Sequence, residues 1–217
     1  MNRKYMLGIL LLLTLSIFVI PTRADSVSLE PIEDTYVSSY WTEDDDNFGS
    51  SDYLYVGEGS WGELYRPFIK FNVPQTTKKV ITATVKTYWY NWALESRIFL
   101  TMAAITSDWD ENFLTWNNMP NLTLSTIDSE FIGDGEWFNA DVLDFIPENG
   151  DFSIYFWGGD REYLMSDSRE EGFLSKPPKL VIEYESESIF QQIDGFFMPI
   201  IVMAIGISVG ILIYKKH

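Results

Sequence analysis

The chain has 217 residues, with 32 acidic and 15 basic side chains, a formal net charge of −17 and no cysteine. This charge disfavours nucleic-acid binding, which needs a basic surface, and the missing thiols exclude disulfides, thiol nucleophiles and zinc–thiolate sites. The only histidine is the last residue, His217, which excludes histidine-based triads and histidine-rich metal centres.

The first 24 residues have the layout of a signal peptide. Arg3 and Lys4 form a basic start, residues 6–20 are apolar, and small residues precede a predicted cleavage site after Ala24. A retained N-terminal anchor is the alternative, although the apolar run is shorter than the ~20 residues that span a bilayer. Cleavage after Ala24 would leave an extracellular domain.

The predicted extracellular part, residues 25–193, concentrates the acidic charge, with 31 acidic and 10 basic side chains. Its densest oxygen cluster is a candidate calcium site, because calcium takes six to eight oxygens from carboxylates and carbonyls. The candidate ligands are Asp44, Asp46, Asn47 and Asp52. Phe48 occupies a ligand position of an EF-hand, so that motif is excluded. A solvated acidic loop is the alternative.

Alternation of apolar and polar residues recurs along residues 25–186 and predicts short strands. The runs are residues 53–56, 66–73, 83–90, 152–157 and 179–184, with a less regular run at 97–105. Turn signals rich in Gly, Asn and Pro separate them. Many short strands without a long helical stripe predict an all-β fold, namely an antiparallel, jelly-roll-like β-sandwich over 25–186.

The same alternation predicts a sugar-binding face. With Leu54, Val56, Ile69, Phe71, Val85 and Trp89 directed inward, the intervening side chains point outward. These are Tyr53, Tyr55, Arg66, Phe68, Lys70, Lys86, Tyr88 and Tyr90. Aromatic rings stack on sugar faces and basic groups hold anionic sugars, so this set is a carbohydrate-binding candidate. Two alternatives remain open: the strands belong to different sheets, or a loop covers the rings.

Predicted loops carry further candidates. Trp41, Trp61 and Trp92 lie beside loops and could line a ligand groove, although packing is the commoner role of a tryptophan. Asn121 begins the sequon Asn-Leu-Thr, which makes it a candidate glycosylation site.

The C-terminal part has the layout of a single membrane span. A linker over 187–195 precedes 19 uncharged residues at 196–214, which as a helix measure ~28 Å. Two lysines follow, so residues 215–217 are a predicted cytoplasmic tail, and the basic end disfavours a GPI signal. Gly206 and Gly210 have the spacing of a helix-pairing motif and predict a homodimer contact, with lipid-facing flexibility as the alternative.

Several motifs occur in a recognisable order. They are Asp34-Thr35-Tyr36-Val37, Trp109-Asp110-Glu111, the run 114–120, Ser168-Arg169-Glu170, and the run 177–184. In this order and spacing they resemble the DNRLRE domain, carbohydrate-binding module family 96, from about Asp34 to Tyr184. The resemblance implies a β-sandwich that binds extracellular polysaccharide, often an anionic one such as alginate or chondroitin-like material, and in that family the module often accompanies catalytic domains.

The favoured function is therefore that of a non-catalytic module, which a single membrane span anchors at the cell surface and which tethers an acidic polysaccharide. The alternative is a structural or adhesive surface protein whose sandwich packs with copies of itself or with a surface layer. A glycosidase is disfavoured, because no nucleophile motif, histidine base or metal triad accompanies the many carboxylates.

Overall fold

The computed structural model describes residues 24–91, 97–120, 122, 125–159, 162–170 and 172–186. Ser26–Tyr184 forms one compact unit. Within the described ranges, no helix is long and apolar enough to cross a bilayer. Several predicted features lie outside the described residues. They are the signal peptide up to Arg23, the linker, the membrane span with its glycine pair, the cytoplasmic tail and Asn121.

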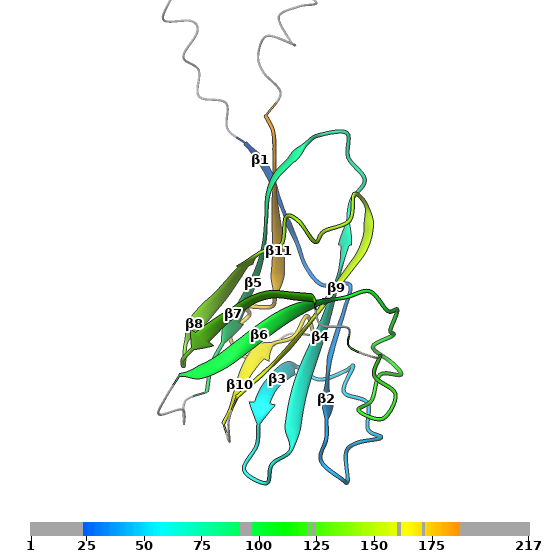
Figure 1. The fold of residues 1–217 in the computed structure, drawn as a ribbon, viewed down its shortest axis with the longest axis vertical. Coiled ribbons are helices and arrows are strands. Elements are labelled where there is room, and N and C mark those ends of the chain that lie inside the picture. Colours follow the sequence, from blue (N-terminus) through cyan, green and yellow to red (C-terminus); the bar gives the residue numbers. More distant parts are fainter. Residues whose placement is uncertain are drawn as a thin grey trace, which may run out of the picture. The chain divides into compact units, whose positions relative to one another are not determined.

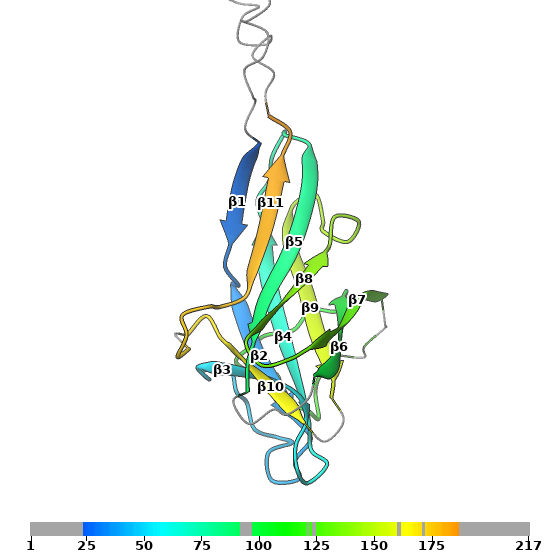
Figure 2. The same ribbon diagram turned by 90° about the vertical axis from the view of Figure 1, so that its left-hand side faces the viewer.

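One sheet has four strands, in the order β1, β11, β5, β8, and faces the viewer in Figure 2. The bounds are β1 (Asp25–Leu29), β11 (Lys179–Tyr184), β5 (Val80–Trp89) and β8 (Glu136–Asp141). β11 and β8 both pair antiparallel with β5. Buried side chains alternate with mostly exposed ones along β8 and with half-buried ones along β11, which is the pattern of a sheet with one solvated face.

The second sheet has seven strands and runs through the lower part of Figure 1. Its order is β10 (Tyr163–Asp167), β3 (Tyr53–Glu58), β4 (Leu64–Val73), β9 (Gly150–Gly158), β6 (Ile98–Ile105) and β7 (Ser125–Ile132), with β2 (Glu33–Ser38) paired to β4 beside this path. All of these pairings are antiparallel.

The main core lies between the two sheets. All six side chains that the alternation directs inward are fully buried in it, together with Phe138 of β8 and Phe156 of β9. The prediction of an all-β antiparallel fold is confirmed, and the shared core of the two sheets is consistent with a β-sandwich. β7 escaped prediction because it is an edge strand with mostly exposed, mixed side chains, which leaves no clean alternation to detect.

A smaller core lies on the outer face of the seven-stranded sheet. The segment 106–120 crosses this face and contributes Trp109 and Leu114, which pack with Phe68 and Tyr155. The Phe68 ring lies 5.8 Å from the rings of both Trp109 and Tyr155, centroid to centroid. A loop therefore covers part of a face that would otherwise meet solvent.

Candidate functional site

The predicted sugar-binding set is divided between the two sheets. Tyr53, Tyr55, Arg66 and Lys70 lie on the seven-stranded sheet, whereas Lys86 and Tyr88 lie on β5 of the four-stranded sheet. Both open alternatives therefore apply, since the strands belong to different sheets and a loop covers part of one face.

The predicted exposure of Lys70 and Phe68 is wrong. Phe68 is fully buried and Lys70 is 4% exposed. The Lys70 Nζ lies 2.7 Å from Glu33 Oε2 and 4.6 Å from the centre of the Trp109 ring, and it donates a hydrogen bond to the Trp109 carbonyl. A buried lysine needs such partners because an unpaired charge away from water is costly. Lys70 therefore holds the covering loop.

Arg66 lies at the rim of the same loop. Its guanidinium carbon is 4.9 Å from the centre of the Trp116 ring, and partial burial lowers its pKa from the ordinary value. Together with Trp116 and Met119 it lines a hollow of about 420 Å³. Arg66 is therefore half-buried, yet it borders an open hollow.

The predicted exposure of Tyr90 is also wrong, because only 2% of this residue is exposed. Tyr90 follows the end of β5 and pairs with Met165 of β10 through two backbone hydrogen bonds of 2.8 and 2.9 Å. Its hydroxyl donates to Asp167 Oδ1 at 3.0 Å, and burial raises its pKa. The chain passes here from one sheet to the other, so the alternation of β5 no longer defines an exposed face.

Tyr53 and Tyr55 are half-buried on β3. The Tyr55 ring packs against Tyr36, Tyr65 and Tyr163, at centroid distances of 5.0, 5.7 and 5.8 Å. Burial raises the pKa of Tyr55. Within the described residues, the ring of Tyr55 packs against other tyrosine rings. A sugar-binding role for Tyr53 and Tyr55 stays a prediction.

The outer face of the four-stranded sheet does bring basic and aromatic side chains together. Lys86 lies directly opposite Lys179 of β11, and Tyr88 lies opposite Trp137 of β8. The rings of Tyr88 and Trp137 are 5.2 Å apart, and the Nζ of Lys176 lies 3.6 Å from the centre of the Tyr88 ring. We call these five residues the basic face.

The charge arrangement of the basic face is unfavourable for the fold itself. Like charges directly opposite each other on neighbouring strands are destabilising, and neither Lys86 nor Lys179 makes an ion pair with another described residue. Acidic residues outnumber basic ones about three to one between residues 25 and 193. Two lysines and two rings on one open sheet can hold an anion that carries an apolar face.

Sequence reasoning missed Lys176, Lys179 and Trp137. Lys179 does alternate outward along its own strand, but the sequence does not say which strand pairs with β5. Lys176 precedes β11, and its backbone N–H donates to Asp167 Oδ2 at 2.8 Å, a contact 9 positions away along the chain. Local alternation predicts that Lys179 points outward, but it does not predict that β11 pairs with β5.

The acidic segment with Asp44 and Asn47 is tied to the covering loop. The Asn47 amide donates to the carbonyls of Glu111 and Leu114, at 2.6 and 2.9 Å. A side chain at Gly49 would collide with the Glu111 carbonyl, so glycine is required there. In the described part of the chain, no three Asp, Glu or His side chains converge as a metal site. Calcium at Asp44, Asp46, Asn47 and Asp52 stays a prediction.

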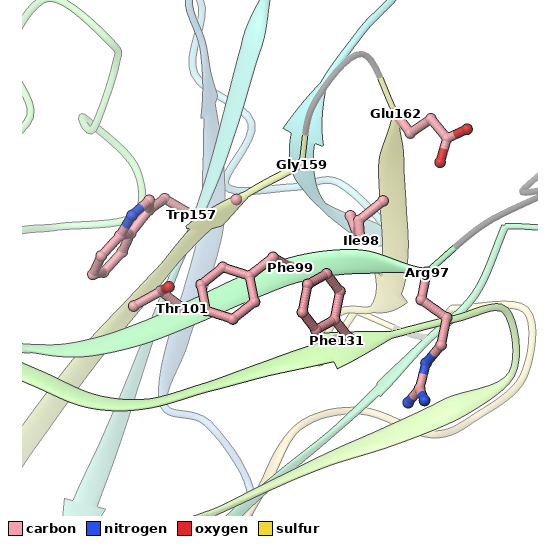
Figure 3. Close-up of a pocket in the computed structure, with 9 residues that line it drawn as sticks. Arg97, Ile98, Phe99, Thr101, Phe131, Trp157, Gly159 and Glu162 are labelled. Atoms are coloured by element: carbon pink, nitrogen blue, oxygen red, sulfur yellow. The ribbon is translucent and has the colours of Figure 1, made fainter.

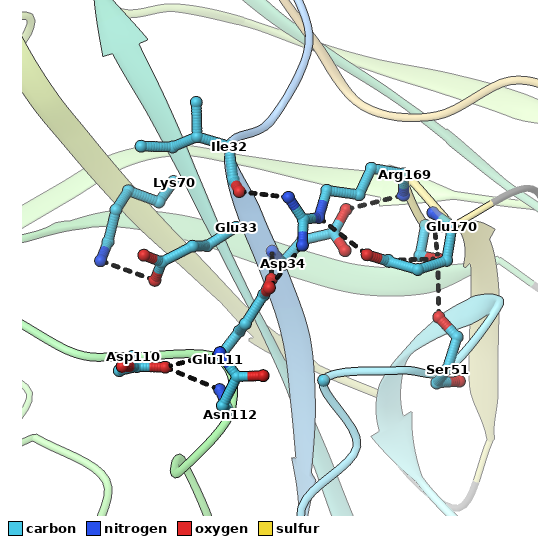
Figure 4. Close-up of polar contacts among 12 residues, drawn as sticks. Ile32, Glu33, Asp34, Ser51, Lys70, Asp110, Glu111, Asn112, Arg169 and Glu170 are labelled. Atoms are coloured by element: carbon cyan, nitrogen blue, oxygen red, sulfur yellow. Dashed lines mark hydrogen bonds and ion pairs between the residues drawn. The ribbon is translucent and has the colours of Figure 1, made fainter.

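Three of the motifs that carried the family resemblance, those with Asp34, Glu111 and Arg169, meet in one polar network, which Figure 4 shows. Arg169 pairs with Glu111 and with Glu170, and donates to the Ile32 carbonyl. The Asp34 N–H donates to Glu111 Oε2 at 3.1 Å, and the Arg169 N–H donates to Asp34 Oδ2 at 3.0 Å. Residues 77 and 135 positions apart are thereby joined at the start of β2.

Asp34 is the most perturbed acid of this network. Burial raises its pKa to about 8, the charge of Glu170 adds to the rise, and the Arg169 N–H opposes it. Glu111 also has a raised pKa, chiefly through burial, while Arg169 opposes the rise. Because the network joins three distant chain segments at the start of β2, we interpret its role as structural.

The family of this chain follows from its similarity to known proteins. A search of curated proteins finds no match. Among solved structures, the CBM22-1–GH10 modules of Clostridium thermocellum endo-1,4-β-D-xylanase 10B, complexed with xylohexaose, share 9% identity at a TM-score of 0.33, over 75% of this chain and 29% of that chain. The model of carbohydrate-binding module family 96 matches residues 25–184. The chain therefore belongs to carbohydrate-binding module family 96.

Proposed function

We propose that the protein is a non-catalytic module that holds an acidic extracellular polysaccharide at the cell surface, and that it does so through the basic face. The observation that carries the proposal is the opposed pair Lys86–Lys179, which stands beside two rings in a strongly acidic domain. A sugar carboxylate or sulfate between the two amines would turn their repulsion into attraction. Its ring would stack on Trp137, which is 41% exposed.

The first test compares the full-length chain, purified in a mild nonionic detergent, with its Lys86→Gln/Lys179→Gln variant. We expect the double variant to bind alginate or chondroitin sulfate at least tenfold more weakly in isothermal titration. Wild-type affinity should fall with added salt, because screening weakens exposed charge pairs. Lys79→Gln is the matched control, since Lys79 is exposed and lies roughly 20 Å from Lys86 along the strand direction.

Two results would count against the proposal. Wild-type affinity in the double variant would remove the basic face as the site. Failure of the wild-type chain to bind any anionic glycan would remove the acidic-polysaccharide function itself. The same titration is run with calcium and with a chelator. The candidate calcium ligands are Asp44, Asp46, Asn47 and Asp52, so we expect the glycan to bind more tightly with calcium.

The anchoring part of the proposal rests on the sequence of residues 1–24 and 196–214. We expect the intact chain in the membrane fraction, with residues 25–193 accessible to protease added outside the cells. A variant that ends at Ile193 should be released into the medium. Release of the intact chain into the medium would contradict the membrane anchor, and it would leave the proposed glycan site unaffected.

An adhesive role remains the second candidate, and two exposed tryptophans favour it. Trp41 and Trp61 are 76% and 85% exposed. The backbone N–H of Ser39, two positions before Trp41, donates to the carbonyl of Leu64, three positions after Trp61. Large exposed apolar side chains are typical of contact surfaces. Sedimentation of the full-length chain and of its Trp41→Ala/Trp61→Ala variant tests this role: self-association that the variant loses, without glycan binding, would favour it.

A further inference from the structure

The outer face of the seven-stranded sheet continues beyond the covering loop as an open groove. The groove has a volume of about 530 Å³ and lies over β6, β7 and the end of β9 (Figure 3). This volume falls within the roughly 300–1,000 Å³ that small-molecule sites occupy. None of its lining residues belongs to the basic face.

Exposed aromatic rings form one wall of the groove. Phe99 of β6 lies directly opposite Phe131 of β7, and the two ring centroids are 5.0 Å apart. The two residues are 47% and 57% exposed. Trp157 of β9 lies opposite Thr101 and stacks on Tyr155 at 5.0 Å, so its ring is held in place. A sugar ring gains by covering such apolar surfaces.

Two glycines allow the backbone to pack closely at the end of β9, beside the groove. Gly158 has φ 148°, and a side chain there would collide with the Phe99 carbonyl. Gly159 has φ 81°, a conformation that favours glycine. Its N–H donates to the Phe99 carbonyl at 3.2 Å. Close backbone packing therefore requires both glycines at this end of the groove.

Among the lining residues that the structure describes, the polar groups carry no excess positive charge. Arg97 is an ion-pair partner of Glu136 at 2.6 Å, and Glu162 contributes a carboxylate to the lining. The Thr101 hydroxyl accepts a hydrogen bond from Ser129 at 3.0 Å. These groups offer hydrogen bonds to sugar hydroxyls.

We propose that this groove is a second glycan site, which takes an uncharged pyranose segment of a polysaccharide. Phe99, Phe131 and Trp157 would stack on the sugar rings, while Arg97, Thr101 and Glu162 would bond to their hydroxyls. The proposal goes beyond the basic face, because it concerns the other sheet, other residues and a ligand of different charge. With two such sites, one chain binds both acidic and neutral stretches of extracellular polysaccharide.

The test uses the full-length chain with neutral hexasaccharides, namely cellohexaose, laminarihexaose and mannohexaose, beside an alginate hexasaccharide. We expect at least one neutral hexasaccharide to bind and to change the fluorescence of Trp157, which a Trp157→Phe variant should abolish. Phe99→Ala/Phe131→Ala should weaken neutral binding at least tenfold and leave alginate binding unchanged. Phe99→Leu/Phe131→Leu keeps apolar side chains and should lose binding as well, which guards against a variant that fails to fold.

Each outcome decides between the two sites. Loss of alginate binding in Lys86→Gln/Lys179→Gln with neutral binding kept supports two separate sites. Failure of all three neutral hexasaccharides to bind, or equal binding by the phenylalanine variants, overturns the groove proposal and leaves the basic face untouched. A dimer that these variants dissociate, without sugar binding, would make the groove a contact between two copies and overturn the proposal too.

Discussion

The outer faces of the two sheets begin from the same alternation and end differently. On the four-stranded sheet, β5 places Lys86 outward, where it meets solvent and another lysine. On the seven-stranded sheet, β4 places Lys70 outward, where the segment 106–120 covers it and supplies partners for its charge. Alternation therefore determines the face on which a side chain lies, and long-range contacts determine what covers that face.

The largest effect that we expect concerns Asp34, near the start of β2. Its folded-state pKa of about 8 exceeds its ordinary value of 3.8, so the folded chain binds a proton that the unfolded chain releases between these values. The free energy of unfolding should fall as pH rises from about 4 to 8, by at most about 1.4 kcal/mol per pH unit from this group.

Asp34→Asn should remove this pH dependence and raise stability at pH 8. The asparagine oxygen still accepts from the Arg169 N–H. Urea unfolding of the full-length chain and the variant at pH 5 and pH 8 measures the difference. An equal pH slope in the two chains would mean that Asp34 ionises normally in the folded protein.

The second-largest effect concerns Lys70, whose counterpart on the other sheet is Lys86. Lys70→Gln removes a buried amine and leaves Glu33 and the Trp109 carbonyl without their donor. We expect a loss of about 2–3 kcal/mol in the free energy of unfolding, below the full cost of breaking a buried pair because Glu33 is partly exposed. Urea unfolding checks this value, and an unchanged midpoint would show that the loop does not depend on Lys70.

The smallest effect has the opposite sign. Lys86→Gln relieves the repulsion with Lys179, so the free energy of unfolding should rise by about 0.2–1 kcal/mol, while binding of anionic polysaccharide should weaken. A gain in stability together with a loss of binding is typical of a residue kept for function. Destabilisation by Lys86→Gln would instead make Lys86 a structural residue, as Lys70 is.

The polar network of Figure 4 shows how far motifs alone could be interpreted. The sequence placed Asp34, Glu111 and Arg169 in motifs with a recognisable order, yet it gave no reason for their acidic and basic types. In the structure they hold one another across 77 and 135 positions of the chain. Such pairing depends on which segments meet, and a motif list does not contain that information.

The same limit applies to the two candidate sugar sites. Lys86 and Tyr88 could be predicted as outward residues, whereas their neighbours Lys179 and Trp137 come from strands 93 and 49 positions away along the chain. The groove was missed because Phe99 and Phe131 belong to a less regular run and to an edge strand without alternation. Cross-strand neighbours follow from strand order, which local periodicity does not encode.

The sequence by itself determined the all-β class, the inward residues of the main core and the family, because side-chain alternation and ordered motifs are local properties of the chain. Only the tertiary structure decided which outward residues reach solvent. Strand order separated Arg66 from Lys86, a covering loop buried Lys70, and a crossing between sheets buried Tyr90. These outcomes depend on contacts between distant segments, and the sequence of a single strand does not determine those contacts.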